Sequence, residues 1–266
     1  MSAYVELSFG QVGLAALLIL VNATVSIGLK LQIERTLALA AVRTVVQLLL
    51  VGLVLEWVFR IERWYVVMGL ACIMTSIAGW TASRRSRRYY GGMVFDTIVS
   101  VWASSWIITA YVMLVVMRGV DRWYQPQYAI PLLGMVLGNT LNGISVGLST
   151  LLESLTTARP QVETLLALGA TRWEAARRPV GQAVHTGMIP IINSMMVVGI
   201  VSLPGMMTGQ LVSGMAPIEA VKYQIVIMFM VASATALGTV AIVLLGFRRL
   251  FNDDHQFLAA RIVDRS

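Results

Sequence analysis

Apolar residues gather along this chain into long runs that short polar segments separate. A helix needs about 20 apolar residues to cross a hydrocarbon core roughly 30 Å thick. In lipid, the backbone of such a run can satisfy its hydrogen bonds internally only as a helix. The pattern therefore predicts seven membrane-spanning helices, at residues 8–29, 36–58, 64–82, 95–117, 130–151, 185–204 and 218–247.

Composition supports a membrane protein rather than a soluble one. Hydrophobic residues make up 58% of the chain and charged residues 12%, whereas soluble domains carry about 25% charged residues. We expect an all-α membrane protein, a polytopic bundle of about seven transmembrane helices. Residues 1–266 are predicted to form a single transmembrane domain with a short polar insertion at about 152–184.

The distribution of basic residues predicts the orientation. Loops on one side of the predicted membrane carry 14 of the 20 Lys and Arg residues, and loops on the other side carry four. Basic loops stay in the cytoplasm, which places the N-terminus outside and the C-terminus and residues 152–184 inside. Residues 1–10 carry no Lys or Arg, so the first run is predicted to remain a span rather than a cleaved signal.

Two enzyme motifs bear on whether the chain itself could be catalytic. A Walker A loop needs a Lys that follows a Gly, and neither Lys30 nor Lys222 does, so any ATP and Mg would bind a separate ATPase chain and this chain would bind no cofactor. The sequence from Gly143 through Ser145 to Gly147 matches the serine hydrolase elbow, but it lies inside a predicted helix. Packing of Gly143 and Gly147 against other helices is the favoured interpretation, with an intramembrane enzyme built on Ser145 as the alternative. The pairs Gly134/Gly138 and Gly205/Gly209 repeat this spacing.

The polar insertion predicts two short helices on the cytoplasmic side. Pro160 suits the first turn of a helix and Gly169 its end, and Thr171 with Glu174 forms a capping box that opens a second helix. Apolar side chains near the bend are Leu165, Leu166, Leu168 and Trp173. This pattern fits either an amphipathic helix on the lipid headgroups or a coupling element that enters a groove on a cytoplasmic motor.

The spacing from Glu163 to Gly169 and Ala170 resembles the EAA loop of ABC transporter permeases. Longer stretches resemble the Fet-type iron export permeases, a family that includes plant proteins linked to aluminium tolerance. These stretches are Ile130–Gly143, Leu165–Ala170, Ile189–Met196 and Val201–Gln210. The resemblance implies a homodimer in a bacterial inner membrane that is paired with two copies of an ABC ATPase. Its implied role is to export iron or a related solute and to aid metal homeostasis and resistance to metal or oxidative stress. The residues it places against the ATPase are Glu163, Leu165, Leu166, Gly169, Ala170 and Trp173.

Polar residues inside spans are candidates for a substrate path, because such groups usually face the bundle interior or water. Candidates within spans are Arg43, Asn139, Asn142 and Asn193. The asparagines also suit hydrogen bonds between helices. Residues 205–217 are predicted to be irregular and to form an outer gate carrying Met206 and Met207, although methionine also suits simple packing.

No four-ligand metal pattern is evident in the sequence, so the metal ligands stay unknown and iron depends on the resemblance alone. A stand-alone secondary transporter of a small solute is the alternative function. Such transporters usually contain internal repeats and helices broken at the midplane. The two halves of this sequence show no convincing repeat.

Overall fold

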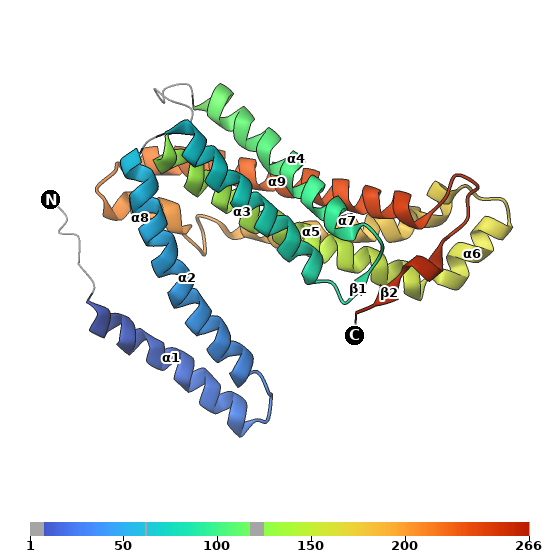
Figure 1. The fold of residues 1–266 in the computed structure, drawn as a ribbon, viewed down its shortest axis with the longest axis horizontal. Helices are drawn as coiled ribbons and strands as arrows, with labels where there is room; N and C mark the ends of the chain where they lie inside the picture. The colour runs from blue at the N-terminus through green and yellow to red at the C-terminus, as the bar shows by residue number, and fades with distance from the viewer. Residues whose placement is uncertain (1–7, 62, 118–124, 266) are drawn as a thin grey trace.

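The computed structural model describes residues 8–61, 63–117 and 125–265. Figure 1 shows a long bundle with a separate N-terminal hairpin. The long helices are α1 (Phe9–Gly28), α2 (Glu34–Ile61), α3 (Trp64–Arg84), α4 (Met93–Tyr111), α5 (Pro126–Thr157), α7 (Arg172–Val197) and α9 (Pro217–Leu250). The shorter elements are β1 (Arg88–Tyr89), the π-helix η1 (Val112–Val116), α6 (Arg159–Ala167), α8 (Gly205–Val212), the 3-10 helix η2 (Ala259–Arg261) and β2 (Val263–Asp264).

The prediction of an all-α membrane protein with roughly seven spans is confirmed. Each predicted span overlaps one of the seven long helices. Within the described residues, six of these helices are long and apolar enough to cross a membrane. The remaining one is α7, whose first two turns carry Arg172, Glu174, Arg177 and Arg178.

The bundle is built from α3, α4, α5, α7 and α9, with α5 buried along much of its length. Glycine allows α5 and α7 to approach closely: a Cβ on Gly187 would lie 2.8 Å from the carbonyl oxygen of Gly143 and 2.6 Å from Thr239 Cγ2 of α9. The predicted packing role of Gly143 and Gly147 is therefore confirmed. Added Cβ atoms on Gly138, Gly205 and Gly209 would meet nothing within 4 Å among the described residues, so these glycines do not mark close contacts there.

The hairpin of α1 and α2 lies apart from the bundle (Figure 1). Ser26 Oγ donates a 2.6 Å hydrogen bond to Glu34 Oε2 and closes the turn between the two helices. Only the end of α2 joins the bundle, where Val58 packs with Val67 of α3 and Ile130 of α5. Most apolar side chains of α1 and α2 are exposed, which suits lipid or another protein surface.

Three local predictions need correction. The predicted span 185–204 corresponds to a helix that starts earlier, at Arg172, and ends at Val197. The second helix of the insertion is therefore not short, because it is the first part of α7. Composition predicts that residues 205–217 are irregular, but α8 forms there: Pro204 precedes its first turn, and Gly214, with φ of 89°, follows its end. These start and stop signals, together with the packing of Met206 against the bundle, outweigh the polar composition.

Candidate functional site

The turn between α6 and α7 has the geometry that its sequence predicts. Gly169 has φ of 91°, in the left-handed region that favours glycine. The Ala170 N–H donates to the Leu165 carbonyl and the Gly169 N–H to the Leu166 carbonyl, each at 3.0 Å. These two bonds form a Schellman motif, so the end of α6 is firmly set.

The same turn presents apolar side chains to solvent. Leu168 is 79% exposed, and Leu165 and Trp173 are each nearly half exposed. Leu166 differs, because it is half-buried and packs against the main core together with the buried Val162. Of the leucines near the turn, Leu165 and Leu168 form the exposed surface, whereas Leu166 anchors α6.

Other predicted coupling residues support the turn. Glu163 Oε1 accepts a 2.7 Å charged hydrogen bond from Arg159 Nε on the exposed side of α6. Trp173 packs edge-on against the Phe247 ring of α9 with a centroid distance of 5.6 Å. Ala170 is half-buried. The structure thus places the predicted coupling residues on one helix–turn–helix, but none of these positions tests a contact with an ATPase.

The predicted capping box at the start of α7 is confirmed. Thr171 Oγ1 accepts from the Glu174 N–H, and the Glu174 carboxylate accepts from the Thr171 N–H at 2.8 Å. The Thr171 backbone bond, followed by its hydroxyl bond, lowers the pKa of Glu174 below its ordinary value. The capping carboxylate is therefore held in its charged form.

The C-terminal tail, residues 251–265, holds the start of α7 from the other side. Arg172 Nη1 donates to Asp253 Oδ1 at 2.7 Å and to the Asn252 carbonyl at 3.0 Å. The Arg172 N–H also donates to His255 Nδ1 at 3.2 Å. These residues lie about 80 positions apart, and sequence reasoning missed them because no local pattern marks the pairing.

The far end of the tail is fixed to the α3–α4 connection. β2 pairs antiparallel with β1, and Arg265 Nη1 donates to the carbonyl oxygens of Ser83 and Arg84 at the end of α3. Arg88 of β1 binds Glu153 of α5 at 2.7 Å and Asp264 of the tail at 3.0 Å. The tail therefore connects the α6–α7 turn with the ends of α3 and α5.

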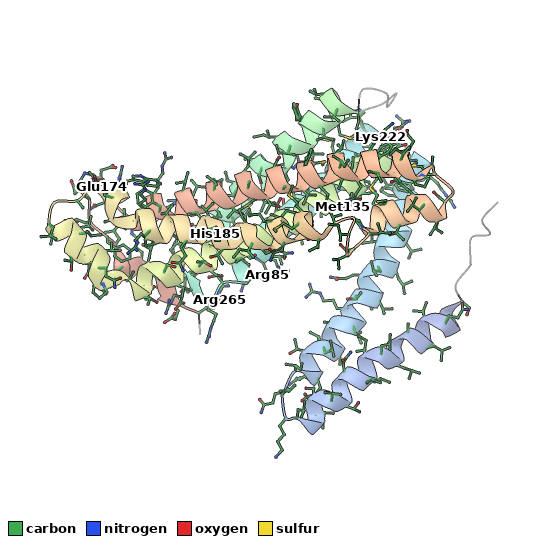
Figure 2. All side chains as sticks on the ribbon, turned by 180° about the vertical axis from the view of Figure 1, so that it is seen from behind. Arg85, Met135, Glu174, His185, Lys222 and Arg265 are labelled. Atoms are coloured by element: carbon green, nitrogen blue, oxygen red, sulfur yellow. The ribbon has the colours of Figure 1, made fainter. Side chains whose placement is uncertain are left out.

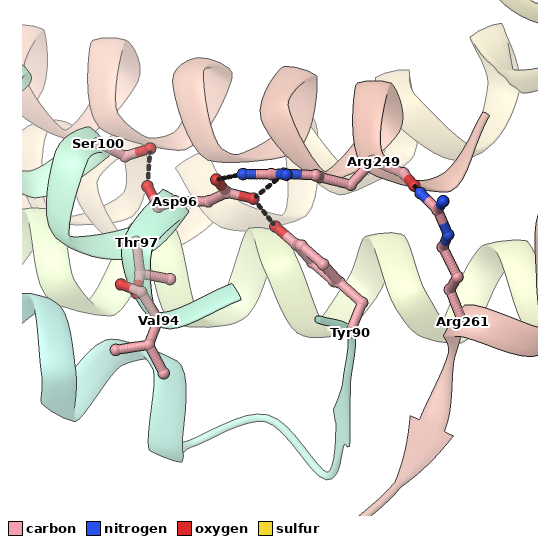
Figure 3. A network of polar contacts seen from close by, with 7 residues as sticks. All are labelled: Tyr90, Val94, Asp96, Thr97, Ser100, Arg249 and Arg261. Carbon is pink, nitrogen blue, oxygen red and sulfur yellow. Dashed lines mark hydrogen bonds and ion pairs between the residues drawn. The ribbon is translucent and has the colours of Figure 1, made fainter. Parts of the chain in front are cut away.

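A buried carboxylate joins α4, α9 and the end of β1 (Figure 3). Asp96, 2% exposed, accepts hydrogen bonds from Tyr90 Oη at 3.0 Å and from Arg249 Nη2 at 3.2 Å. Burial and the Asp96 charge raise the pKa of Tyr90, so its hydroxyl remains a donor. Arg261 donates to the Arg249 carbonyl, which adds the tail to this network. The role of the network is structural, because the Asp96 carboxylate and the Tyr90 hydroxyl find their partners within the protein.

A mostly polar strip of exposed and half-buried side chains runs along α5 and α7, and we call this strip the α5–α7 face. Its members recur every three or four residues and are exposed or half-buried: Met135, Asn139, Asn142, Val146, Ser149 and Glu153 of α5, with Arg178, Gln182, His185 and Ile189 of α7. Figure 2 shows Glu174 and Lys222 at opposite ends of the bundle, with His185, Arg85 and Met135 between them.

Two hollows open at the α6 end of this face. One, of about 460 Å³, is lined by Arg85, Arg87, Arg88, Ser149, Glu153 and Gln182 among others. The other, of about 540 Å³, is lined by Glu153, Gln161, Arg178 and Gln182 among others. Glu153 and Gln182 belong to both hollows, so the two adjoin and form one polar surface.

The predicted path residues do not form one cluster. Asn142 Oδ1 accepts a 2.6 Å hydrogen bond from Arg85 Nη1, a residue that the sequence did not single out. Asn139 donates to the Met135 carbonyl within its own helix. Asn193 is exposed on α7, and Arg43 is exposed on α2, where it makes no hydrogen bond or ion pair among the described residues.

The two methionines lie toward the opposite end, on α8. Met206 lines a hollow of about 450 Å³ together with Tyr128, Glu219 and Lys222, and Lys222 Nζ binds Glu219 at 2.7 Å. Met207 is half-buried nearby in sequence. Residues 8–61, 63–117 and 125–265 contain no group of three or more His, Cys, Asp or Glu side chains placed to hold a metal ion.

Ser145 occupies the middle of α5 rather than a strand-to-helix turn. Its side chain is buried, and its Oγ donates to the Ala82 carbonyl of α3 at 3.4 Å. The geometry that exposes a hydrolase nucleophile is therefore not formed here.

Long apolar helices, an exposed face along α5 and α7 and a helix–turn–helix at one end define a multi-pass helical membrane protein. The sequence profile of the Uncharacterised protein family (UPF0014) matches residues 9–251. The chain belongs to this family.

Curated relatives match over most of their length. The UPF0014 membrane protein slr1647 of Synechocystis is 37% identical over 86% of this chain and 88% of its own. The probable iron export permease protein FetB of Escherichia coli is 28% identical over 95% of each chain. Protein ALUMINUM SENSITIVE 3 of Arabidopsis thaliana is 32% identical over 91% of this chain and 87% of its own. No solved structure matches the chain.

Proposed function

We propose that this chain is the membrane-spanning subunit of an ATP-driven exporter and that a separate ABC ATPase supplies the energy. The observation that carries the proposal is the α6–α7 turn. A Schellman ending presents Leu168, which is 79% exposed, and the partly exposed Leu165 and Trp173 at the surface of the described chain. A turn that already has its bound conformation loses little conformational entropy when its apolar side chains enter a groove on a partner.

The α6 end faces the cytoplasm in this proposal, with the C-terminus on the same side and the N-terminus outside. The end of α3, the loop into α4 and the start of α7 contribute Arg84, Arg85, Arg87, Arg88, Arg177 and Arg178 there. Basic residues beside spans favour the cytoplasmic side. For a bacterial chain, the membrane is the inner membrane, and the turn then meets the compartment that contains ATP.

A second copy of the chain covers the α5–α7 face. Asn139 and Asn142 lie near the middle of a 32-residue helix, where lipid contact is costly for amides. Burial between two copies places them beside a shared path, and α1 and α2 offer further apolar surface for that contact. Arg43, Asn193, Met206 and Met207 remain candidate path residues, with the α8 hollow as the exit.

Iron is the proposed cargo, and metal homeostasis is the proposed role. This step depends on the relative described as a probable iron export permease, FetB, whose match spans 95% of both chains. The test is the iron content of cells that lack this chain, its ATPase or both. A higher iron content in all three deletion strains than in the parent strain supports export. Unchanged iron, or transport by the purified chain without any ATPase, contradicts the proposal, and the second result favours a secondary transporter.

Docking is tested separately with Leu168→Asp, because this side chain is 79% exposed. We expect the variant to insert and fold normally but to lose co-purification of the ABC ATPase subunit co-expressed from the same genome. Val263→Asp is the matched control, since Val263 is exposed at the same end of the bundle but belongs to β2. Equal recovery of the ATPase with both variants would show that the turn is not the docking surface.

A further inference from the structure

Arg85 places a positive charge along the α5–α7 face. It follows the last residue of α3, and its Nη1 atom donates to Asn142 Oδ1 at 2.6 Å. Asn142 lies near the middle of α5, a helix of 32 residues that runs from Pro126 to Thr157. The guanidinium therefore contacts the middle of α5, and it also lines the hollow beside Ser149 and Glu153.

Around the two hollows, arginine side chains outnumber carboxylates. Arg85, Arg87 and Arg88 line one hollow and Arg178 lines the adjoining one. The carboxylate that lines both is Glu153, and Arg88 already binds it at 2.7 Å. Within the described residues, Arg85, Arg87 and Arg178 form no ion pair with a carboxylate. The described part of this surface therefore has three guanidinium groups without a carboxylate partner, and each can pair with an anion.

Topology alone does not explain this arrangement. Basic residues beside spans are expected on the cytoplasmic side, and Arg84, which lies over the Trp80 ring at 5.1 Å, fits that explanation. Arg85 differs because its charged end is directed along α5 to a neutral amide. Beside Asn142 this charge has no carboxylate partner within the described residues, so it can pair with an anion. Asparagine, glutamine and serine side chains add uncharged donors beside it: Asn142, Ser149 and Gln182.

We propose that the α5–α7 face admits its cargo as an oxygen-rich anion, so that iron enters as an anionic chelate and not as a bare cation. The inference rests on the proposed export function and specifies its substrate class. Guanidinium groups bind carboxylate and phosphate oxygens in bidentate geometry, and a hollow of about 460 Å³ holds a small chelate. A bare Fe²⁺ ion would be repelled by Arg85 and Arg178 at the same place.

The test measures binding to the full chain with its ATPase in phosphatidylcholine nanodiscs. The probes are radioactive ferric citrate, radioactive Fe²⁺ without chelator, and radioactive citrate. We expect binding of ferric citrate that weakens with salt, and no saturable binding of Fe²⁺. Arg85→Gln should weaken binding at least tenfold, a loss of about 1.4 kcal/mol, because glutamine can still donate to Asn142 but carries no charge. Arg85→Lys should restore part of the affinity.

Arg84→Gln is the matched control, because it removes a charge from the preceding residue, which does not line either hollow. Its affinity should stay within twofold of the unchanged chain. The melting temperature of each variant separates lost binding from lost folding. Saturable binding of Fe²⁺ in preference to ferric citrate, or equal weakening by Arg84→Gln and Arg85→Gln, would overturn the proposal.

Anionic lipid headgroups share the same chemistry, so a second arm uses nanodiscs that contain phosphatidylglycerol. Retention of phosphatidylglycerol that depends on Arg85, with ferric citrate binding unaffected by Arg85→Gln, would assign the cluster to lipid and reject a soluble cargo. Iron retention in deletion strains and ATPase co-purification test the export function without using these binding measurements. If ferric citrate does not bind, the proposed anionic form of the cargo is wrong, but the proposed export function is not contradicted.

Discussion

Gly187 provides a quantitative test of how the bundle is packed. The perturbation is Gly187→Ala, which adds one methyl group between α5, α7 and α9. That Cβ would lie 2.6 Å from Thr239 Cγ2, 2.8 Å from the Gly143 carbonyl oxygen and 3.2 Å from Gly147 Cα. Two of the three atoms belong to the backbone, so the helices must separate for the methyl group to fit.

Two effects of opposite sign set the magnitude. Alanine is favoured over glycine inside a helix by about 1 kcal/mol. Overpacking costs about 1–3 kcal/mol, and contact with backbone atoms places Gly187→Ala at the upper end of that range. The expected net loss is about 2 kcal/mol of unfolding free energy, or a fall of roughly 4–8 °C in melting temperature for a chain of this size.

Gly69→Ala is the control, because Gly69 is also inside a spanning helix but an added Cβ there meets nothing within 4 Å. Its melting temperature should stay the same or rise by about 2–4 °C. The assay is thermal unfolding of both purified variants in the same detergent, followed by intrinsic tryptophan fluorescence. If Gly187→Ala melts no lower than Gly69→Ala, then α5 and α7 are not in close contact at Gly187.

Three further predictions concern the α6 end. Folding lowers the pKa of Glu174, so the stabilisation from its cap is complete above the ordinary pKa of 4.5 and is lost as the pH falls through the pKa of the folded state. Hydrogen exchange of the first turn of α7 should therefore accelerate in acid. Glu174→Gln should remove that pH dependence. Asp96→Leu leaves the buried Tyr90 hydroxyl without an acceptor and should lower the unfolding free energy by about 1–3 kcal/mol, measured by thermal unfolding against the exposed control Asp254→Leu. Gly169→Pro cannot adopt φ of 91° and should abolish ATPase co-purification while the chain still inserts into membranes; recovery of an intact complex would contradict the importance of this turn.

Local sequence patterns were sufficient for the approximate positions of the spans and for the caps at the α6–α7 turn. Long apolar runs have one stable form in lipid, and caps such as Thr171 with Glu174 depend on neighbours three residues away. Composition alone gave a wrong prediction for residues 205–217. Their polar and glycine content suggested irregular backbone, but Pro204 and Gly214 mark the start and end of a helix there.

Contacts between distant residues could not be predicted in this way. Arg85 and Asn142 are 57 positions apart, and Arg172 and Asp253 are 81 apart. Each pair depends on how whole helices are arranged, and a single sequence carries no periodic signal for that arrangement. The separation of α1 and α2 from the bundle is of the same kind, because exposed and buried apolar residues look alike along a membrane helix.

The C-terminal tail contacts both the α6–α7 turn and the α5–α7 face, and its two attachments differ in their number of ion pairs. At the face, Arg88 is 22% exposed and forms two ion pairs, with Glu153 (66% exposed) and Asp264 (81% exposed). At the turn, Arg172 is 33% exposed and forms one ion pair, with Asp253, which is 97% exposed; each such solvent-exposed pair contributes about 0–1 kcal/mol. A partner that displaces the α6–α7 turn would therefore break the Arg172–Asp253 contact first. The two Arg88 ion pairs at the α5–α7 face would remain, so the tail is held by more contacts at this face than by the Arg172 ion pair at the turn.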